Sequence, residues 1–163
     1  MIDAIVIVSD HTPKEWVQQA IDSVHVAASN APFDVKVHVT AGVPGHRGRA
    51  KQHAYAQGNY PYVTVIDDDD YVAPNFFEVV DPKLLEEQKI SGIFIREIYL
   101  VENRQHRAEE NLNHKLVAVR RDVVQTLPFE DYPRGDGGMV KRAIEERNDH
   151  VDLHEWVYYR RLR

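Results

Sequence analysis

The sequence predicts an α/β protein in which a mixed, mostly parallel sheet is flanked by helices. Two observations carry this prediction: apolar, β-branched runs alternate with helical patterns, and the third run ends directly in four aspartates. Such alternation is typical of sheets with parallel strands, and ligands of these sheets bind at the carboxyl ends of strands. The length of 163 residues fits one domain, over residues 1–163.

The first predicted unit is a strand followed by a helix. Residues 4–8 read AIVIV, a continuous run that suits a strand buried on both faces. Residues 12–15 read TPKE, which combines a capping box with proline at the first helical position. Apolar residues then recur at helical spacing from Trp16 to Val24 and predict an amphipathic helix.

The second unit repeats this order and leads to the aspartates. Residues 35–39 alternate as a half-buried strand does. A helix is predicted over residues 49–57, with Gly58 as its C-terminal stop. Residues 63–66 read VTVI and predict a third strand, which continues without a spacer into residues 67–70.

The later part of the chain is less regular. Its most polar stretch, residues 103–113, is expected to form an exposed loop. We expect short strands over residues 92–95, 98–101, 116–119 and 155–159, and a helix over residues 136–147.

Composition excludes several classes of protein. The chain has 43% hydrophobic and 28% charged residues, which argues against global disorder. It has no cysteine, so a disulfide scaffold, a thiolate zinc site and a cysteine nucleophile are excluded. No apolar stretch approaches the roughly 20 residues of a membrane span, and the start does not resemble a signal peptide. We therefore expect a cytoplasmic protein, and its net charge of −6 gives no general attraction to nucleic acid.

The aspartate run is the most informative feature of the sequence. Adjacent carboxylates repel one another and destabilise the protein unless another charge offsets them. At the carboxyl end of a strand, carboxylate oxygens can hold a hard divalent cation. The alternative is a solvated acidic turn that binds no ligand.

The order of these segments resembles that of a known family. Residues 65–74, VIDDDDYVAP, resemble the DXD segment of family 2 GT-A glycosyltransferases. Residues 4–24 resemble the opening strand and helix of that family, and residues 48–50 stand where it often has Ala-Arg-Asn. Residues 116–129 resemble its late strand, helix and turn, and residues 135–136 resemble its acidic segment at a helix start. The resemblance covers most of the chain and implies a GT-A fold.

The resemblance implies a metal-dependent glycosyltransferase that moves a sugar from a nucleotide-diphosphate donor to an acceptor hydroxyl with inversion. Mn²⁺ or Mg²⁺ is the implied cofactor, because both accept carboxylate oxygen. Asp67, Asp69 and His154 are its implied ligands, while Asp70 would orient the loop. The acceptor stays open among a saccharide, a lipid, a protein and a modified nucleic acid.

The remaining implied roles concern the base and the donor. Asp136 is the implied catalytic base, since inverting transfer needs a carboxylate near the acceptor hydroxyl; the alternative is a simple N-cap. The acidic pair that the family usually carries after its second strand is absent, so the nucleobase is left open. The implied donor-binding residues are Asp10, Arg49, Asp67 and Asp68.

Basic side chains could meet the diphosphate of the donor. Arg47, Arg49 and Lys51 crowd the first turn of a predicted helix, where a bound anion would offset their unfavourable position. Near the end of the chain, Arg160 or Arg161 could approach the same group. In each case the alternative is a solvated basic residue.

Two other functions are compatible with the aspartates. A metal-dependent phosphoryl- or nucleotidyl-transfer enzyme would also carry carboxylates at a strand end, and a non-enzymatic cation-binding module would need no nucleotide. Hydrolysis of a sugar nucleotide without hydrolysis of phosphate esters would distinguish glycosyl transfer from the first. Nucleotide affinity would distinguish it from the second.

Overall fold

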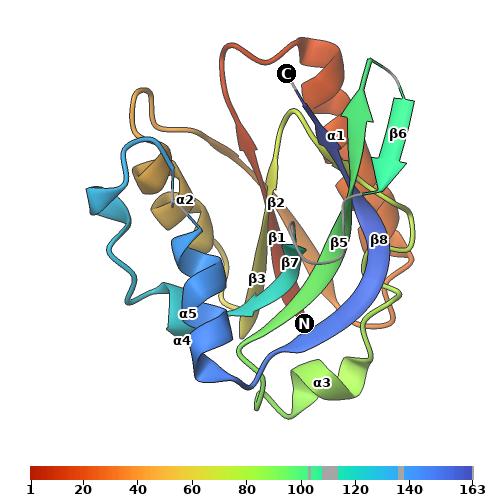
Figure 1. Ribbon diagram of the computed structural model, residues 1–163, viewed down its shortest axis with the longest axis vertical. Helices are drawn as coiled ribbons and strands as arrows, with labels where there is room; N and C mark the ends of the chain where they lie inside the picture. The colour runs from red at the N-terminus through yellow and green to blue at the C-terminus, as the bar shows by residue number, and fades with distance from the viewer. Residues whose placement is uncertain (103, 108–113, 136–137, 163) are drawn as a thin grey trace.

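The computed structural model describes residues 1–102, 104–107, 114–135 and 138–162, and its centre is an eight-stranded sheet. The strand order is β2-β1-β3-β7-β5-β8-β4, and β6 pairs with β5 (Figure 1). The strands are β1 (Ile2–Val8), β2 (Val35–Ala41), β3 (Tyr62–Asp67), β4 (Tyr71–Val72), β5 (Gly92–Val101), β6 (Arg104–Arg107), β7 (His114–Arg120) and β8 (Val151–Arg161). The helices are α1 (Lys14–Ser29), α2 (Arg47–Tyr55), α3 (Pro82–Glu86), α4 (Arg121–Val124) and α5 (Met139–Arg147), with a 3₁₀ turn over Phe129–Asp131.

The N-terminal part of the sheet is parallel. Strand β1 pairs in parallel with β2 on one side and with β3 on the other, so Ile2 lies between Val35 and Tyr62. The first five residues of β1 are buried, as the continuous apolar run requires. The three strands expected over residues 4–8, 35–39 and 63–66 are confirmed, and their carboxyl ends meet at one edge of the sheet.

The C-terminal part is mixed. Strand β7 is antiparallel to both β3 and β5, whereas β8 is parallel to β5, so β3, β5 and β8 run in the same direction. The short strand β4 pairs with β8 on its outer side, with Tyr71 opposite Tyr159. This pairing brings the residues that follow the aspartate run beside the end of the last strand.

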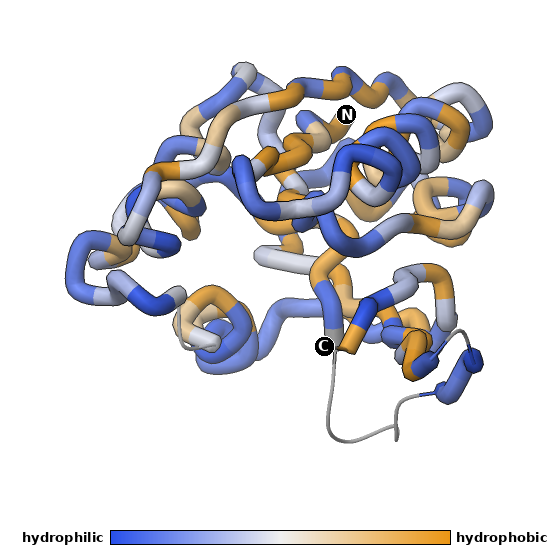
Figure 2. The backbone as a smooth tube through the Cα atoms, turned by 90° about the horizontal axis from the view of Figure 1, so that it is seen from above, coloured by the Kyte–Doolittle hydropathy of each residue, from blue (hydrophilic) through white to orange (hydrophobic). Residues whose placement is uncertain are grey.

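Helices cover both faces of the sheet, as expected for this fold class (Figure 1). Helix α1 packs on one face through Ala20, Val24 and Ala27, in the same apolar cluster as Phe76 and Phe77. Residues of α2, α4 and α5 form a second apolar cluster on the other face. Figure 2 shows the resulting pattern, with apolar backbone segments toward the centre and polar ones outside. Among the described residues, no helix combines the length and the apolar character that a membrane crossing needs.

Two sequence-based predictions were wrong in their details because polar side chains form long-range contacts. Residues 92–101 form one strand rather than two, since Arg96 and Glu97 are buried within it and face partners on β8. The capping box does not form: the Thr12 hydroxyl donates to Asp68, and no described side chain caps the start of α1.

Several element boundaries also differ from the predictions. Helix α2 begins and ends two residues earlier than expected, and β8 is longer than the predicted strand at both ends. Part of the expected polar loop is strand β6, while residues 103 and 108–113 lie outside the described residues. The predicted helix over residues 136–147 corresponds to α5 from Met139 onward, and residues 136–137 also lie outside the described residues.

Candidate functional site

The four aspartates alternate in exposure after β3. Asp67 and Asp69 are partly exposed, whereas Asp68 and Asp70 are only 6% and 4% exposed. The Asp70 amide donates to the Asp67 carbonyl at 3.2 Å, which closes a turn over the run. The four carboxylates therefore have two different environments, and each pair has different partners.

Asp68 is used by the fold. Its carboxylate accepts hydrogen bonds from the Ser9 amide at 2.7 Å, the Ser9 hydroxyl at 3.1 Å and the Thr12 hydroxyl at 3.0 Å. These contacts tie the end of β3 to the loop between β1 and α1. Asp10 lies in an exposed turn of the same loop. The direct donor contacts expected of Asp10 and Asp68 stay predictions.

Asp70 joins the run to the last strand. Its carboxylate accepts hydrogen bonds from the Tyr158 hydroxyl at 2.7 Å and the Arg161 amide at 3.0 Å. Burial, together with the nearby charges of Asp67 and Asp69, raises the pKa of Asp70 to about 6. The carboxylate is thus expensive to ionise in the folded protein, and its hydrogen bonds fix the position of β8 relative to the run.

Asp67 forms an ion pair with Lys51, whose Nζ lies 2.9 Å from Asp67 Oδ1. Burial alone would raise the pKa of Asp67, but the positive charges of Lys51, Lys115 and Arg160 lower it below its usual range. Asp67 is therefore ionised at neutral pH. Its side chain is 44% exposed, so the carboxylate stays accessible to a ligand.

The sequence contains a signal for the Lys51–Asp67 pair in the helical spacing of α2. Lys51 precedes the buried residues Ala54 and Tyr55 by three and four positions. Residues at this spacing share one face of a helix, and here that face packs on the sheet. The helical periodicity could therefore have placed Lys51 toward β3.

Two accessible carboxylates fit a divalent cation only if other oxygens complete its coordination. Among the described residues, no group of three or more His, Asp or Glu side chains is placed to hold a metal ion. Mg²⁺ is usually bound by one or two carboxylates together with phosphate oxygens and water. Asp67 and Asp69 therefore fit a cation that is bound jointly with a diphosphate.

Arg161 is held in place by several contacts. Its guanidinium lies 4.6 Å from the ring centre of Trp16 and 5.3 Å from that of Tyr71. Its Nη1 donates to the Asp69 carbonyl at 2.6 Å, and its Nη2 donates to Gln19. Arg161 therefore fixes the backbone of the aspartate run.

Two further cations lie near the aspartates on the C-terminal strands. Lys115 of β7 lies over the ring of Tyr158, with Nζ 4.6 Å from its centre. Arg160 of β8 pairs with Glu97, with Nη1 3.6 Å from Oε2, and its side chain is 47% exposed. With Lys51, these residues place positive charge from three different elements near Asp67.

The first amides of α2 already have acceptors within the protein, so an anion at this helix start would have to be bound by side chains. The Arg49 side chain is exposed. Its expected donor contact stays a prediction. The amide hydrogen bonds run from Arg47 N to Pro133 O (2.9 Å), from Gly48 N to Tyr132 O (3.0 Å) and from Arg49 N to His46 Nδ1 (2.9 Å).

His154 lies on β8 and contacts Arg96 and Asp152. Its Nδ1 is 3.0 Å from Arg96 Nη2, and its amide donates to Asp152 Oδ1 at 3.1 Å. Because arginine can only donate, the Nδ1 lone pair accepts this hydrogen bond. The described contacts of His154 are with Arg96 and Asp152 rather than with the aspartate run, so its role as a metal ligand stays a prediction. Asp136, the expected base, lies outside the described residues.

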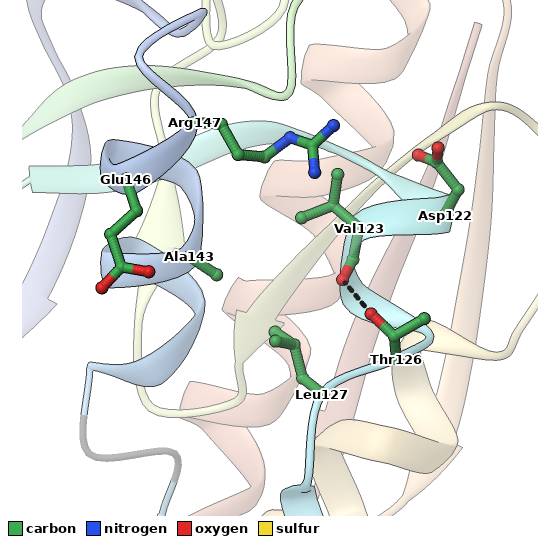
Figure 3. Close-up of a pocket in the computed structure, with 7 residues that line it drawn as sticks. All are labelled: Asp122, Val123, Thr126, Leu127, Ala143, Glu146 and Arg147. Carbon is green, nitrogen blue, oxygen red and sulfur yellow. Dashed lines mark hydrogen bonds between the residues drawn. The ribbon is translucent and has the colours of Figure 1, made fainter.

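Two hollows of the surface lie away from the aspartates. One of about 420 Å³ is lined by residues of α4, α5 and the loop after α4 (Figure 3). Another, of about 320 Å³, is lined by residues 131–135, which adjoin the start of α2. Neither includes the aspartates. The candidate site is instead an open edge of the sheet, selected by its converging charges rather than by its volume.

This topology, with carboxylates at the end of β3, is the GT-A type of fold, which glycosyltransferases and nucleotidyltransferases share. Among solved structures, the chain is similar to S. aureus TarS, a GT-A glycosyltransferase. The TM-score is 0.73 at 13% identity, over 99% of this chain and 36% of TarS. For TarS 1–349 in complex with UDP-GlcNAc, the TM-score is 0.71 at 14% identity, over 99% of this chain and 58% of that one.

A second group of similar structures has a different chemistry. A putative glucose-1-phosphate thymidylyltransferase from Bacillus anthracis has a TM-score of 0.59 at 7% identity, over 100% of this chain and 87% of that one. No family model and no curated protein matches the sequence. At these identities the likeness establishes the fold, and the expected GT-A fold is confirmed.

Proposed function

We propose that this chain is a metal-dependent glycosyltransferase unit that binds a nucleotide-diphosphate sugar at the aspartate edge of the sheet. The observation that carries the proposal is that Asp67 and Asp69 are both partly exposed, with Lys51, Lys115 and Arg160 placing positive charge near Asp67. Mixed charges of this kind suit a ligand that brings both a cation and an anionic diphosphate. The chain spans 36% to 60% of the TarS chains that it matches, so the acceptor-binding part of such an enzyme is left open.

In the proposed mechanism, Asp67 and Asp69 would hold Mn²⁺ or Mg²⁺, which would supply positive charge to offset the charge that develops on the leaving diphosphate. Lys51 keeps the Asp67 carboxylate ionised and oriented before the donor arrives. Arg160 and Lys115 add positive charge on the side of β8 and β7.

The remaining roles follow from the resemblance of the sequence. Asp136 takes the proton of the acceptor hydroxyl in an inverting displacement. Asp10 and Arg49 contact the donor, while Asp68 supports the loop between β1 and α1, which carries Asp10, through Ser9. His154 as a third metal ligand would require it to leave its present partner Arg96, and metal titration of His154→Ala tests this role separately.

The experiment that tests the proposal is thermal unfolding with a panel of nucleotide sugars, each with Mn²⁺, with Mg²⁺ and with EDTA. UDP-GlcNAc is the first to test, because TarS was crystallised with it. A ligand at 100 times its dissociation constant stabilises the folded state by about 2.7 kcal/mol, so the melting temperature should rise only when metal is present. The control for a nonspecific effect of charge on this stabilisation is Asp34→Asn, which removes an exposed carboxylate before β2. No metal-dependent stabilisation by any nucleotide sugar would contradict the proposal.

Nucleotidyl transfer is the second candidate, favoured by the coverage of 87% of the thymidylyltransferase-like chain. The two reactions release different products. A glycosyltransferase releases a nucleoside diphosphate from a sugar nucleotide, whereas a nucleotidyltransferase releases pyrophosphate from a nucleoside triphosphate and a sugar phosphate. Product identification by phosphorus NMR distinguishes them directly.

A further inference from the structure

Glu97 is a buried carboxylate at the middle of β5 that the proposed mechanism does not use. Its side chain is 3% exposed, and its Oε2 has no hydrogen-bond partner among the described residues. The cation paired with it is Arg160, with Nη1 at 3.6 Å. A buried charge destabilises a protein unless a partner compensates it. The buried Glu97 carboxylate therefore attracts the Arg160 guanidinium and restricts where it lies.

Arg160 lies on β8, which pairs with β5 on one side and on the other with β4, the short strand directly after the aspartate run. Glu97 is opposite Tyr158 in the β5–β8 pairing, and Arg160 follows two residues later on β8. The Tyr158 hydroxyl binds Asp70, so this stretch of β8 contacts the run directly. Burial alone would lower the pKa of Arg160, but Glu97 and Asp70 raise it, and Arg160 in turn helps to lower the pKa of Asp67. The guanidinium thus acts on carboxylates on both sides.

The neighbouring Arg161 has a different environment. It stacks on Trp16 and Tyr71 and donates to the Asp69 carbonyl, so its guanidinium is committed to the fold. Arg160 is about half exposed, and its contact with Glu97 is an ion pair of 3.6 Å, with no direct hydrogen bond to another described side chain. A guanidinium with free hydrogen-bonding capacity at the rim of the site can donate to phosphate oxygens.

We propose that Glu97 is a positioning residue that holds the Arg160 guanidinium at the rim of the aspartate site, where Arg160 binds a phosphate oxygen of the diphosphate. This inference rests on the proposed function of the site and adds a specific route for recognising the anion. Glu97 acts only through Arg160 and does not contact the ligand.

The sign of the change in anion affinity tests this role. If Glu97 acted only as a negative charge near the site, Glu97→Gln would strengthen the binding of an anion. If it positions Arg160, the same variant should weaken binding despite the lost negative charge. The probe is inorganic pyrophosphate with Mg²⁺, measured by isothermal titration calorimetry on the full chain, because it does not depend on the nucleobase or the sugar.

We expect Arg160→Ala to weaken pyrophosphate binding by about tenfold, as for the loss of a charge-assisted hydrogen bond. Glu97→Gln should weaken it by about threefold to tenfold, and the double variant should be no weaker than Arg160→Ala, because coupled residues are not additive. Glu155→Gln changes the same charge on an exposed residue of β8 and should leave the affinity unchanged. Urea unfolding checks that each variant is folded.

Unchanged or stronger binding by Glu97→Gln would overturn the positioning role while leaving the proposed function intact. The role would also be overturned if the loss of pyrophosphate affinity in the double variant equalled the sum of the losses in the two single variants. If Glu97→Gln does not fold, Glu97→Asp withdraws the carboxylate by one methylene and should weaken binding by about threefold; wild-type affinity in that variant also overturns the role. If the wild-type protein binds neither pyrophosphate nor any nucleotide sugar, the proposed function is overturned together with this inference.

Discussion

Asp67 and Asp69 differ from Asp68 and Asp70 although all four have the same side chain and lie in one turn. The first pair is partly exposed, and Asp67 lies in the positive field of Lys51, Lys115 and Arg160. The second pair is buried and accepts hydrogen bonds from the loop after β1 and from β8. The accessible pair is therefore available to a ligand. The buried pair holds together the elements that carry it.

The buried pair connects the aspartate run to both halves of the molecule. Asp68 links the run to Ser9, in the loop after β1, and Asp70 links it to Tyr158 of β8. These two links fix the backbone on which Asp67 and Asp69 stand. Carboxylates that are fixed in this way lose less conformational freedom when they bind a metal.

The largest effect is expected at Asp136, which belongs to neither pair and whose proposed role is in the chemical step rather than in binding. Asp136→Asn should lower turnover by a factor of about 10²–10⁴, the usual contribution of a positioned base, which corresponds to about 3–5.5 kcal/mol. Donor affinity should survive, because the proposed metal ligands are unchanged. Steady-state kinetics and calorimetry on the same preparation measure both quantities. Wild-type turnover in this variant would exclude Asp136 as the base, and retention of the anomeric configuration would exclude inversion.

Removal of a buried carboxylate should cost stability. Asp68→Ala removes the acceptor of three hydrogen bonds and leaves the Ser9 amide and the Thr12 hydroxyl without it. We expect the free energy of unfolding in urea to fall by about 3 kcal/mol, since hydrogen bonds to a charged group are the stronger ones. Asp34→Ala, at an exposed position, serves as the control and should change stability little. An Asp68→Ala variant with the unfolding free energy of the wild type would contradict the structural role of the buried pair.

The buried pair should also give a characteristic dependence on pH. The pKa of Asp70 is raised from 3.8 to about 6, so between these values the folded state holds a proton that the unfolded state has lost. The contribution of Asp70 is then fully present below pH 3.8 and is lost as the pH rises through 6. Its full size is at most about 3 kcal/mol.

Asp70→Asn removes this titration and keeps one acceptor oxygen for Tyr158. The difference in unfolding free energy between the wild type and this variant, measured in EDTA from pH 4 to pH 7, should therefore decline with increasing pH. A flat difference would mean that Asp70 is not kept protonated by the fold in this range.

The smallest effect is expected for the partner of the accessible pair. Lys51 competes with a cation for the Asp67 carboxylate. Lys51→Met should therefore raise the affinity for Mn²⁺ alone by a factor of about two to five, since partly exposed ion pairs contribute at most about 1 kcal/mol. Lys36→Met, an exposed lysine on β2, is the control. Weaker Mn²⁺ binding would show that Lys51 supports the cation site rather than competing for it.

The sequence was sufficient for the elements that form from contiguous patterns. The apolar runs of β1 and β3 and the aspartates directly after β3 could be identified because each signal is local. The separation of the run into two pairs could not, because the partners of Asp68 and Asp70 lie 56 to 91 positions away in the chain. The same limit explains why β5 was predicted as two strands: Arg96 and Glu97 look like an exposed interruption until β8 supplies their ionic partners.

The most direct test of the account is a set of four single Asp→Asn variants, at residues 67 to 70, each measured for two quantities. One is the affinity for a nucleoside diphosphate with Mn²⁺, starting with UDP, by calorimetry; the other is the free energy of unfolding in urea with EDTA. We predict that the affinity for the nucleoside diphosphate falls only in Asp67→Asn and Asp69→Asn. The loss should be about 100-fold or more if a metal ligand is removed. We also predict that the loss of stability is found in Asp68→Asn. Unchanged affinity in Asp69→Asn, or a loss of affinity that follows the buried pair in variants of wild-type stability, would contradict the account.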